Sequence, residues 1–353
     1  MTTLAICAIF KNEAPYLLEW IAYHRVVGVD HFYLYDNDST DGGARLIQRS
    51  SLAGSVTLTH WGERPGQLSA YRHFISHHRQ ACEWVAFIDV DEFLLPLEGR
   101  SVPQLLQRFE QVSGVLVNWR VFGPSGWEER PEGLVIDNYT RRAADDLRAN
   151  CHVKSIVRCA DLLDVTKNPH EFRLEGAVCD TLGRAVANVA IQPQPVHHVL
   201  VLNHYQTRSR QDWLEKIARG SAMIEQSEPK YDVSLFDHYA EVCVVEDETI
   251  RGFAPELRWA LDAAEAEQAG PDSALWDSRG ELAWERRDGT ALVFCDRGRQ
   301  GMPWIGGLRG PAAELTDPTF LTDEAGRIRD FSSDQAAMAA CDAAVQARLP
   351  SRG

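Results

Sequence analysis

Short apolar segments alternate with amphipathic segments along the first 90 residues of this chain of 353 residues. Residues 4–10 form a nearly continuous apolar run, which indicates a buried strand, and residues 15–27 carry an i, i+3, i+4 apolar stripe, which indicates a helix. Strands that alternate with helices form a mostly parallel sheet covered by helices, so the sequence predicts an α/β fold. Further strands are predicted at 31–35, 56–60, 84–88 and 114–120, and further helices at 43–50, 67–80 and 102–112.

Polar loops follow three of the predicted strands, at residues 11–13, 36–41 and 89–92. In an open α/β sheet, ligands bind beyond the carboxyl ends of the strands, where such loops meet. We therefore expect the functional site at this edge of the sheet.

The length is enough for about two domains. We expect a first domain at residues 1–232 and a C-terminal segment at 233–353 that is partly helical, because residues 253–268 and 333–348 are rich in helix formers. The role of this segment is open.

Composition excludes several classes of partner. The chain has 36 Lys and Arg against 51 Asp and Glu, a formal net charge of −15, which argues against general binding to nucleic acid or to an anionic membrane surface. The eight cysteines are scattered without a CxxC pair, as expected of free thiols in a reducing cytosol. The apolar N-terminal run is too short for a signal peptide or a membrane span. We expect a cytoplasmic protein without stable membrane insertion.

An acidic cluster follows the predicted strand at 84–88: Asp89, Asp91 and Glu92. Carboxylates at a strand exit are costly to desolvate unless a cation or hydrogen-bond donors compensate them, and Mg²⁺ or Mn²⁺ suits that need. A solvated acidic turn is the structural alternative. A phosphatase of the aspartyl-phosphate type also uses a DxD pair, but that pair is expected after the first strand, which here is followed by Lys11-Asn12-Glu13.

Two further features belong to the same edge. The loop at 36–41 is dense in turn formers, which fits either recognition of a base or ribose or a turn with Thr40 or Asp41 as helix N-cap. His204 ends another apolar run, at residues 199–204, and its neutral imidazole could complete a carboxylate metal site.

The order of these segments resembles glycosyltransferase family 92 and its bacterial relatives among the family-2-like transferases. The similarity covers roughly residues 4–220. The segments that carry it are Lys11-Asn12-Glu13, residues 18–24, residues 28–41, Gln67, residues 84–96, residues 119–126, Lys154, Asn203-His204-Tyr205, Ser209 and Lys216.

The resemblance implies a GT-A-like fold, with a Rossmann-like nucleotide-binding half. It also implies transfer of a hexose, with UDP-galactose favoured as donor, to a glycan acceptor, with inversion and with a divalent cation, Mn²⁺ or Mg²⁺. The resemblance assigns Asp89, Asp91 and His204 to the metal. It assigns Asn12, Glu13, Asp36 and Asp38 to the nucleotide side, and Lys154 to phosphate or to a pairing acid.

An inverting transfer needs a general base near the acceptor hydroxyl. Glu128 is our candidate by position, with Glu129, Asp137 and Glu171 as alternatives. The family's animal members carry a membrane anchor, which we do not find in this sequence, so we expect a bacterial enzyme acting on a polysaccharide precursor. The alternatives are a non-catalytic protein that binds nucleotide sugars or glycans, and a metal-dependent phosphohydrolase.

Overall fold

The computed structural model of the chain describes residues 2–220 and 232–269, together with six short strands beyond them. The chain divides into two compact units, Met1–Ile47 with Ser55–Ala254, and Gln48–Gly54 with Pro255–Gly353. Residues 233–254, which the sequence analysis assigns to the C-terminal segment, share the first unit with the large sheet.

Nine strands form the large sheet of the first unit: β1 (Thr2–Phe10), β2 (His31–Asp36), β3 (Val56–His60), β4 (Cys82–Phe87), β5 (Glu92–Pro96), β6 (Gly114–Val121), β8 (Val153–Arg158), β11 (Val178–Asp180) and β12 (Leu200–His204). Their order is β3-β2-β1-β4-β8-β6-β12-β5, and β11 pairs with β6. Strands β1 to β4 are parallel to one another, and β11 and β12 are parallel to β6. Only β8 and β5 run antiparallel to their neighbours. This mixed, mostly parallel sheet confirms the predicted α/β class.

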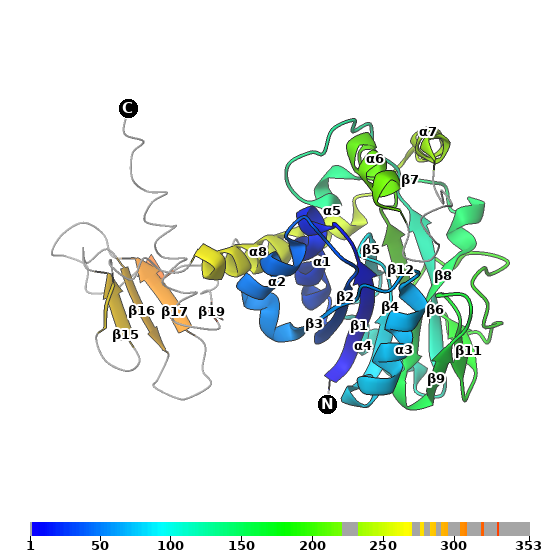
Figure 1. Cartoon of the computed structure of the whole chain (residues 1–353), viewed down its shortest axis with the longest axis horizontal. Helices are drawn as coiled ribbons and strands as arrows, with labels where there is room; N and C mark the ends of the chain where they lie inside the picture. The colour runs from blue at the N-terminus through cyan, green and yellow to red at the C-terminus, as the bar shows by residue number, and fades with distance from the viewer. Residues whose placement is uncertain are drawn as a thin grey trace. The chain divides into compact units, whose positions relative to one another are not determined.

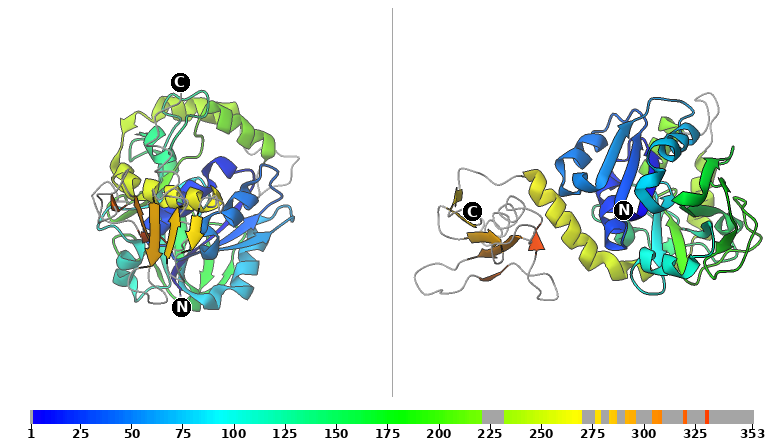
Figure 2. Two further views of the ribbon diagram at one scale, coloured as in Figure 1. Left: turned by 90° about the vertical axis from the view of Figure 1, so that its left-hand side faces the viewer. Right: turned by 90° about the horizontal axis from the view of Figure 1, so that it is seen from below.

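Helices cover both faces of the sheet (Figures 1 and 2). The helices of the first unit are α1 (Ala14–Val26), α2 (Gly43–Arg49), α3 (Gln67–His77), α4 (Val102–Leu106), α5 (Val135–Asn138), α6 (Arg210–Arg219) and α7 (Val233–Val242). Cys7 and Ile9 of β1 pack with Phe74 of α3, whereas Phe32 of β2 packs against Trp20 of α1. Because β1 is buried on both faces, its sequence is a nearly continuous apolar run.

Strand direction brings several loops to one edge. The loops after β1 and β4 meet because these strands are parallel neighbours. Strand β12 runs antiparallel to β5 with His204 opposite Glu92, and β8 runs antiparallel to β4 with Ser155 opposite Phe87. The end of β12 and the beginning of β8 therefore reach the same edge as the acidic cluster.

Short strand pairs and helices complete the described chain. Strand β9 (Leu162–Val165) pairs with β10 (Phe172–Leu174), and β7 (Arg141–Arg142) pairs with β13 (Val245–Glu246). In the second unit, α8 (Ala254–Ala269) confirms the predicted helix at 253–268. The predicted helix at 333–348 lies outside the described residues. A six-stranded sheet that the sequence did not predict is formed by β14 (Trp276–Ser278), β15 (Ala283–Arg286), β16 (Ala291–Cys295), β17 (Trp304–Leu308), β18 (Thr319–Phe320) and β19 (Asp330–Phe331).

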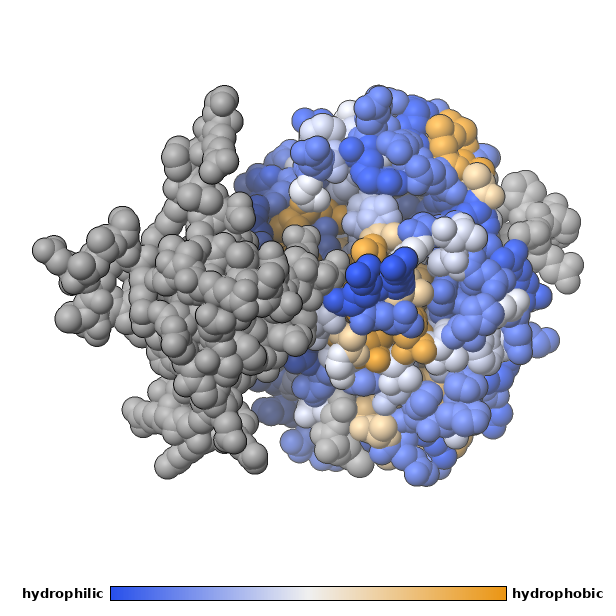
Figure 3. All heavy atoms as spheres, turned by 60° about the vertical axis from the view of Figure 1, so that its left-hand side comes forward, coloured by the Kyte–Doolittle hydropathy of each residue, from blue (hydrophilic) through white to orange (hydrophobic). Residues whose placement is uncertain are grey.

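Among the described residues, no helix combines the length and the apolar character needed to cross a bilayer. Most of the described surface seen in Figure 3 is hydrophilic, with apolar side chains gathered in a few patches.

Candidate active site

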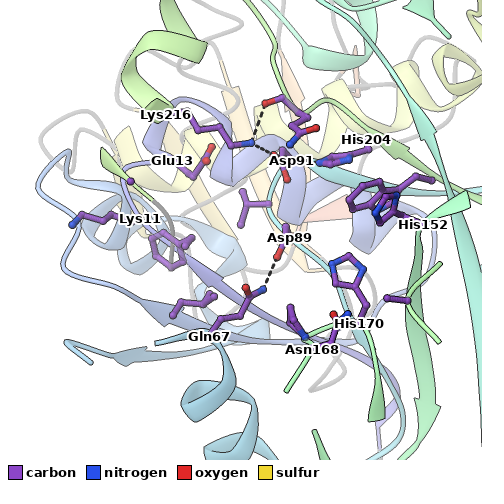
Figure 4. Close-up of a pocket in the computed structure, with 18 of the residues that line it drawn as sticks. Lys11, Glu13, Gln67, Asp89, Asp91, His152, Asn168, His170, His204 and Lys216 are labelled. Atoms are coloured by element: carbon purple, nitrogen blue, oxygen red, sulfur yellow. Dashed lines mark hydrogen bonds and ion pairs between the residues drawn. The ribbon is translucent and has the colours of Figure 1, made fainter. Parts of the chain in front are cut away.

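A cavity of about 740 Å³ opens at the edge of the sheet where the sequence predicts a site. One wall comes from the first half of the sheet and includes Lys11 and Gln67, and the opposite wall comes from later segments and includes His152. Figure 4 shows Asp89 and Asp91 between these two walls. The loops therefore meet as the strand order predicts.

The carboxylates of Asp89 and Asp91 are each paired with a lysine. Asp89 accepts hydrogen bonds from Lys154 Nζ at 2.7 Å and from Gln67 Nε2 at 3.0 Å, and Asp91 accepts one from Lys216 Nζ at 2.5 Å. Burial raises the pKa of both aspartates, but the lysines outweigh this effect. The pKa of Asp89 is therefore lowered, and the pKa of Asp91 is lowered well below its usual range. Both aspartates are therefore ionised at neutral pH.

Glu92 and Lys154 hold this acidic loop in place through hydrogen bonds to Asp89. Glu92 is fully buried, accepts hydrogen bonds from Trp119 Nε1 and from the Asp89 N–H, both at 2.7 Å, and lies 3.5 Å from Lys154 Nζ. Burial raises the pKa of Glu92 to about 8. Burial lowers the pKa of Lys154, but Asp89 and Glu92 outweigh it and raise that pKa. Of the two roles expected for Lys154, the structure shows the pairing with acids.

His204 joins Asp89 and Asp91, as the sequence predicts. Its Nε2 lies 3.7 Å from Asp91 Oδ2, and its ring centroid lies 4.2 Å from that of Trp119. Burial lowers the pKa of His204 and outweighs the opposing effect of Asp91, so the imidazole is neutral.

These three side chains supply donor atoms that suit Mg²⁺ or Mn²⁺, namely two carboxylates and a neutral imidazole. Within the described residues, no group of three His, Cys, Asp or Glu side chains forms a ready-made metal site. Mg²⁺ is usually held by one or two carboxylates, with substrate phosphates completing its coordination. The residues therefore fit a cation that binds together with a diphosphate.

Glu13 lines the cavity and is held by two arginines. Its carboxylate accepts a hydrogen bond from Arg208 Nη1 at 2.7 Å and another from Arg219. Burial raises the pKa of Glu13, but Arg219 and Arg208 outweigh it and lower the value. The neighbouring Asn12 accepts a hydrogen bond from the Thr40 N–H at 2.7 Å, so its side chain ties two loops together.

The loop at 36–41 folds largely on itself. Asp36 accepts a hydrogen bond from the Ser39 N–H at 2.9 Å, and the exposed Asp38 accepts one from Arg64 at 3.2 Å. Asn37 and Arg64 are among the described residues that line the cavity, whereas Asn12, Asp36 and Asp38 are not. Of the predicted nucleotide contacts, Glu13 thus belongs to the described wall of the cavity, whereas Asn12, Asp36 and Asp38 do not.

The structure does not bring the predicted general base into the cavity. The side chain of Glu128 is 69% exposed and accepts a hydrogen bond from Arg210 Nε at 2.8 Å. Neither Glu128 nor its alternatives, Glu129, Asp137 and Glu171, belong to the described lining. Position after a loop does not fix the direction in which a side chain points.

The sequence analysis missed four residues of the site: Arg208, Arg219, His152 and His170. Arg208 lies just before α6 and Arg219 is its last residue. Lys216 and Arg219 share one face of this helix because they are three residues apart. That spacing was the one usable sign of a basic wall. The histidines come from loops without a regular pattern.

A mostly parallel mixed sheet with paired acids at the exit of its fourth strand defines a GT-A-like fold. Residues 2–226 match the model of glycosyltransferase family 92. The chain belongs to this family, as the sequence resemblance predicts.

Curated relatives carry the same family name. A family 92 protein of Oryza sativa subsp. japonica is 29% identical over 208 residues, which cover 58% of this chain and 33% of that protein. One of Ricinus communis is 34% identical over 186 residues, covering 49% of this chain and 31% of that protein. The chain thus spans about a third of the length of these relatives. They are plant proteins, so the expected bacterial source stays a prediction.

Among solved structures, Staphylococcus aureus TarS 1-349 in complex with UDP is 10% identical, with a TM-score of 0.35, covering 86% of this chain and 98% of that one. Mycobacterium tuberculosis glucosyl-3-phosphoglycerate synthase in complex with Mn²⁺, UDP and glucosyl-3-phosphoglycerate is 21% identical, with a TM-score of 0.26, covering 34% and 44%.

Proposed function

We propose that this chain transfers a hexose from a nucleotide sugar to a glycan acceptor, with inversion and with a divalent cation. The observation that carries the proposal is the pair of ionised aspartates, Asp89 and Asp91, in a cavity of a family 92 fold. UDP-galactose is the favoured donor because of the family resemblance.

The first wall of the cavity suits the nucleotide. Lys11 offers a hydrogen-bond donor there, and Ile9 and Phe10 offer apolar surface for a base. Asn37 and Gln67 offer their amide oxygens as acceptors, because their NH₂ groups already donate to Trp61 and Glu63 and to Tyr71 and Asp89. Glu13, Asn12, Asp36 and Asp38 remain our proposed nucleotide-side residues. Asn12, Asp36 and Asp38 would act by fixing the loop or by closing on the bound donor.

The centre of the cavity suits the diphosphate. Asp89, Asp91 and His204 would hold the cation, and the basic groups of Lys216 and Arg219 lie on the same side as Asp91 and Glu13. A bound cation would neutralise the charge that develops on the leaving diphosphate. Lys216 and Arg219 would add fixed positive charge to that leaving group.

The acceptor and the compartment complete the proposal. We take the acceptor to be a sugar hydroxyl of a glycan precursor. A cytoplasmic setting is supported by the six cysteines whose side chains the structure describes, because they are buried free thiols.

Thermal unfolding with nucleotides tests the donor site. We expect UDP and UDP-galactose, each with Mn²⁺, to raise Tm by an amount that grows with ligand concentration, and EDTA to remove the shift. Release of UDP from UDP-galactose would then show turnover. A shift without UDP release would favour a non-catalytic binding protein. Release of inorganic phosphate from simple esters without a nucleotide shift would favour a phosphohydrolase.

A further inference from the structure

The described wall of the cavity holds three carboxylates, and all of them are paired with cations. Asp89 is bound to Lys154, Asp91 to Lys216, and Glu13 to Arg208 and Arg219. A carboxylate held in this way is a poor proton acceptor, because the neighbouring cation stabilises its ionised form. An inverting transfer nevertheless needs a group that accepts the proton of the acceptor hydroxyl.

Two histidines on the opposite wall present a free ring nitrogen. The Nδ1 of His152 lies 3.0 Å from the carbonyl oxygen of Ala149, and the Nδ1 of His170 lies 2.6 Å from that of Val153. A carbonyl oxygen only accepts hydrogen bonds, so Nδ1 carries the hydrogen and Nε2 carries the lone pair in each neutral ring. In the part of the chain that the structure describes, the hydrogen bonds of these two rings are made at Nδ1.

The His152 ring is fixed in place. It stacks on Trp119 with centroids 4.7 Å apart and an angle of 21° between the planes, and its carbonyl oxygen accepts the Trp119 N–H at 2.9 Å. Trp119 in turn donates its ring N–H to the buried carboxylate of Glu92. Figure 4 shows His152 across Asp89 and Asp91 from Lys11. With the nucleotide on the Lys11 wall and the diphosphate at the aspartates, the His152 wall is the space left for the acceptor.

His170 is the less suitable of the two bases. Burial lowers its pKa to about 3, so its lone pair binds a proton too weakly for efficient general base catalysis near neutral pH. It remains a hydrogen-bond acceptor that can orient a sugar hydroxyl.

We propose that His152 is the general base that activates the acceptor hydroxyl. This inference rests on the proposed function. The acceptor oxygen bonds to C1 of the donor hexose as the bond from C1 to the diphosphate oxygen breaks. The diphosphate leaves with that electron pair, and the hydroxyl proton moves to His152 Nε2 and then to solvent.

The surroundings of His152 contain few charges that compete with this role. From the neighbouring segments, the His170 ring faces it at 6.4 Å between centroids, Trp119 covers one face, and Ile191 pairs with its backbone. Lys154, two residues further along β8, directs its ammonium group to Asp89 and Glu92.

The pH profile of transfer tests the proposal. UDP release from UDP-galactose is measured between pH 5 and 9, first with water as acceptor and then with methyl β-galactoside and methyl β-N-acetylglucosaminide. A protonated imidazole cannot accept a proton, so the wild-type rate falls on the acid side. We expect His152→Gln to lower kcat at least about 100-fold and to lose this acid limb. Its UDP-induced Tm shift with Mn²⁺ stays as in the wild type.

Three further variants make the outcome decisive. His170→Gln is expected to keep the acid limb, and the exposed surface variant His77→Gln to keep full activity. Imidazole added to His152→Ala is expected to restore part of the rate without changing nucleotide binding. The proposal is overturned if His152→Gln keeps the wild-type rate and pH profile, or if the acid limb disappears in His170→Gln instead. If the wild type releases no UDP although it is folded, the proposed function itself has failed.

Discussion

Two loops of this molecule are similarly acidic and similarly placed after parallel strands, yet they are stabilised in different ways. The loop at 89–92 buries Asp91 and Glu92, and its two aspartates are paired with buried or nearly buried lysines, Asp89 with Lys154 and Asp91 with Lys216. The loop at 36–41 keeps Asp38 partly exposed and uses Asp36 and Asp41 to accept backbone N–H groups. A carboxylate that leaves water needs a cation or hydrogen-bond donors in its place, whereas one that stays in water does not.

This difference shows why an acidic motif alone does not define a site. The neighbours of the loop at 89–92 come from β8 and α6, which lie 65 and 125 residues away along the chain. Distant cations converge on this loop because β8, which is antiparallel to β4, begins at the exit of β4, and because β12 ends at the same edge. The predictions below test whether burial and compensation separate the two loops.

Removing a buried charge at the centre of the site should have the largest effect. In Asp91→Asn, Lys216 loses its carboxylate partner and the proposed cation loses a ligand. We expect UDP release to fall at least about 100-fold and the Mn²⁺-dependent Tm shift with UDP to disappear. A rate within tenfold of the wild type would contradict the assigned role of Asp91.

Removing the buried cation should destabilise the fold itself. Lys154 is 1% exposed, so Lys154→Met leaves Asp89 and Glu92 without compensation. We expect a loss of about 3 kcal/mol in the free energy of unfolding, measured by urea titration, because breaking a buried ion pair costs roughly 3 to 5 kcal/mol and Glu92 can become protonated. Lys167→Met, at an exposed position on the same cavity, is the control and should change stability by less than about 0.5 kcal/mol.

The double variant Lys154→Met with Glu92→Gln sharpens this test. If the uncompensated charge of Glu92 causes part of the loss, the second substitution recovers part of it. Strictly additive losses would mean that the two side chains act independently.

The large sheet was predictable from the sequence because each of its first strands carries an apolar run bounded by turn formers. The meeting of Asp89, Asp91 and His204 followed from strand direction. The six short strands after α8 were missed because segments of two to five residues are too short to show a period of two.

The rest of the site depends on tertiary structure that no local pattern encodes. His152 reaches the cavity from the loop before β8, and His170 reaches it from the loop between β9 and β10. Glu128 follows a turn in the expected region, but its pairing with Arg210 holds the carboxylate away from the described cavity wall. Sequence position identifies a loop as near the site, whereas side-chain direction is set by partners far along the chain.

Glu19 tests burial without a bonded cation. Its carboxylate is buried on α1 and accepts the N–H groups of Val135 at 2.8 Å and Ile136 at 3.3 Å. Burial raises its pKa from 4.5 to about 7. The folded protein therefore holds this proton more tightly than the unfolded chain, so the resulting stability is complete below pH 4.5 and is lost as pH rises to about 7.

We expect the free energy of unfolding of the wild type, relative to Glu19→Gln, to fall by about 3 kcal/mol between pH 4.5 and pH 8. Urea titrations of both proteins across this range measure the difference. A difference that does not change with pH would show that Glu19 ionises in the folded protein as it does in the unfolded one.

The smallest effect is expected at the exposed acid of the other loop. Asp38 accepts hydrogen bonds from His60 at 2.9 Å and Arg64 at 3.2 Å, and its side chain is 42% exposed. Water replaces such partners at little cost, so Asp38→Asn should change Tm by less than about 1 °C. The same variant tests the nucleotide side, because Arg64 lines the cavity. A UDP affinity that falls more than tenfold in Asp38→Asn would give this loop a direct part in donor binding, whereas an unchanged affinity would leave the pairing of acids with lysines as the property that separates the two loops.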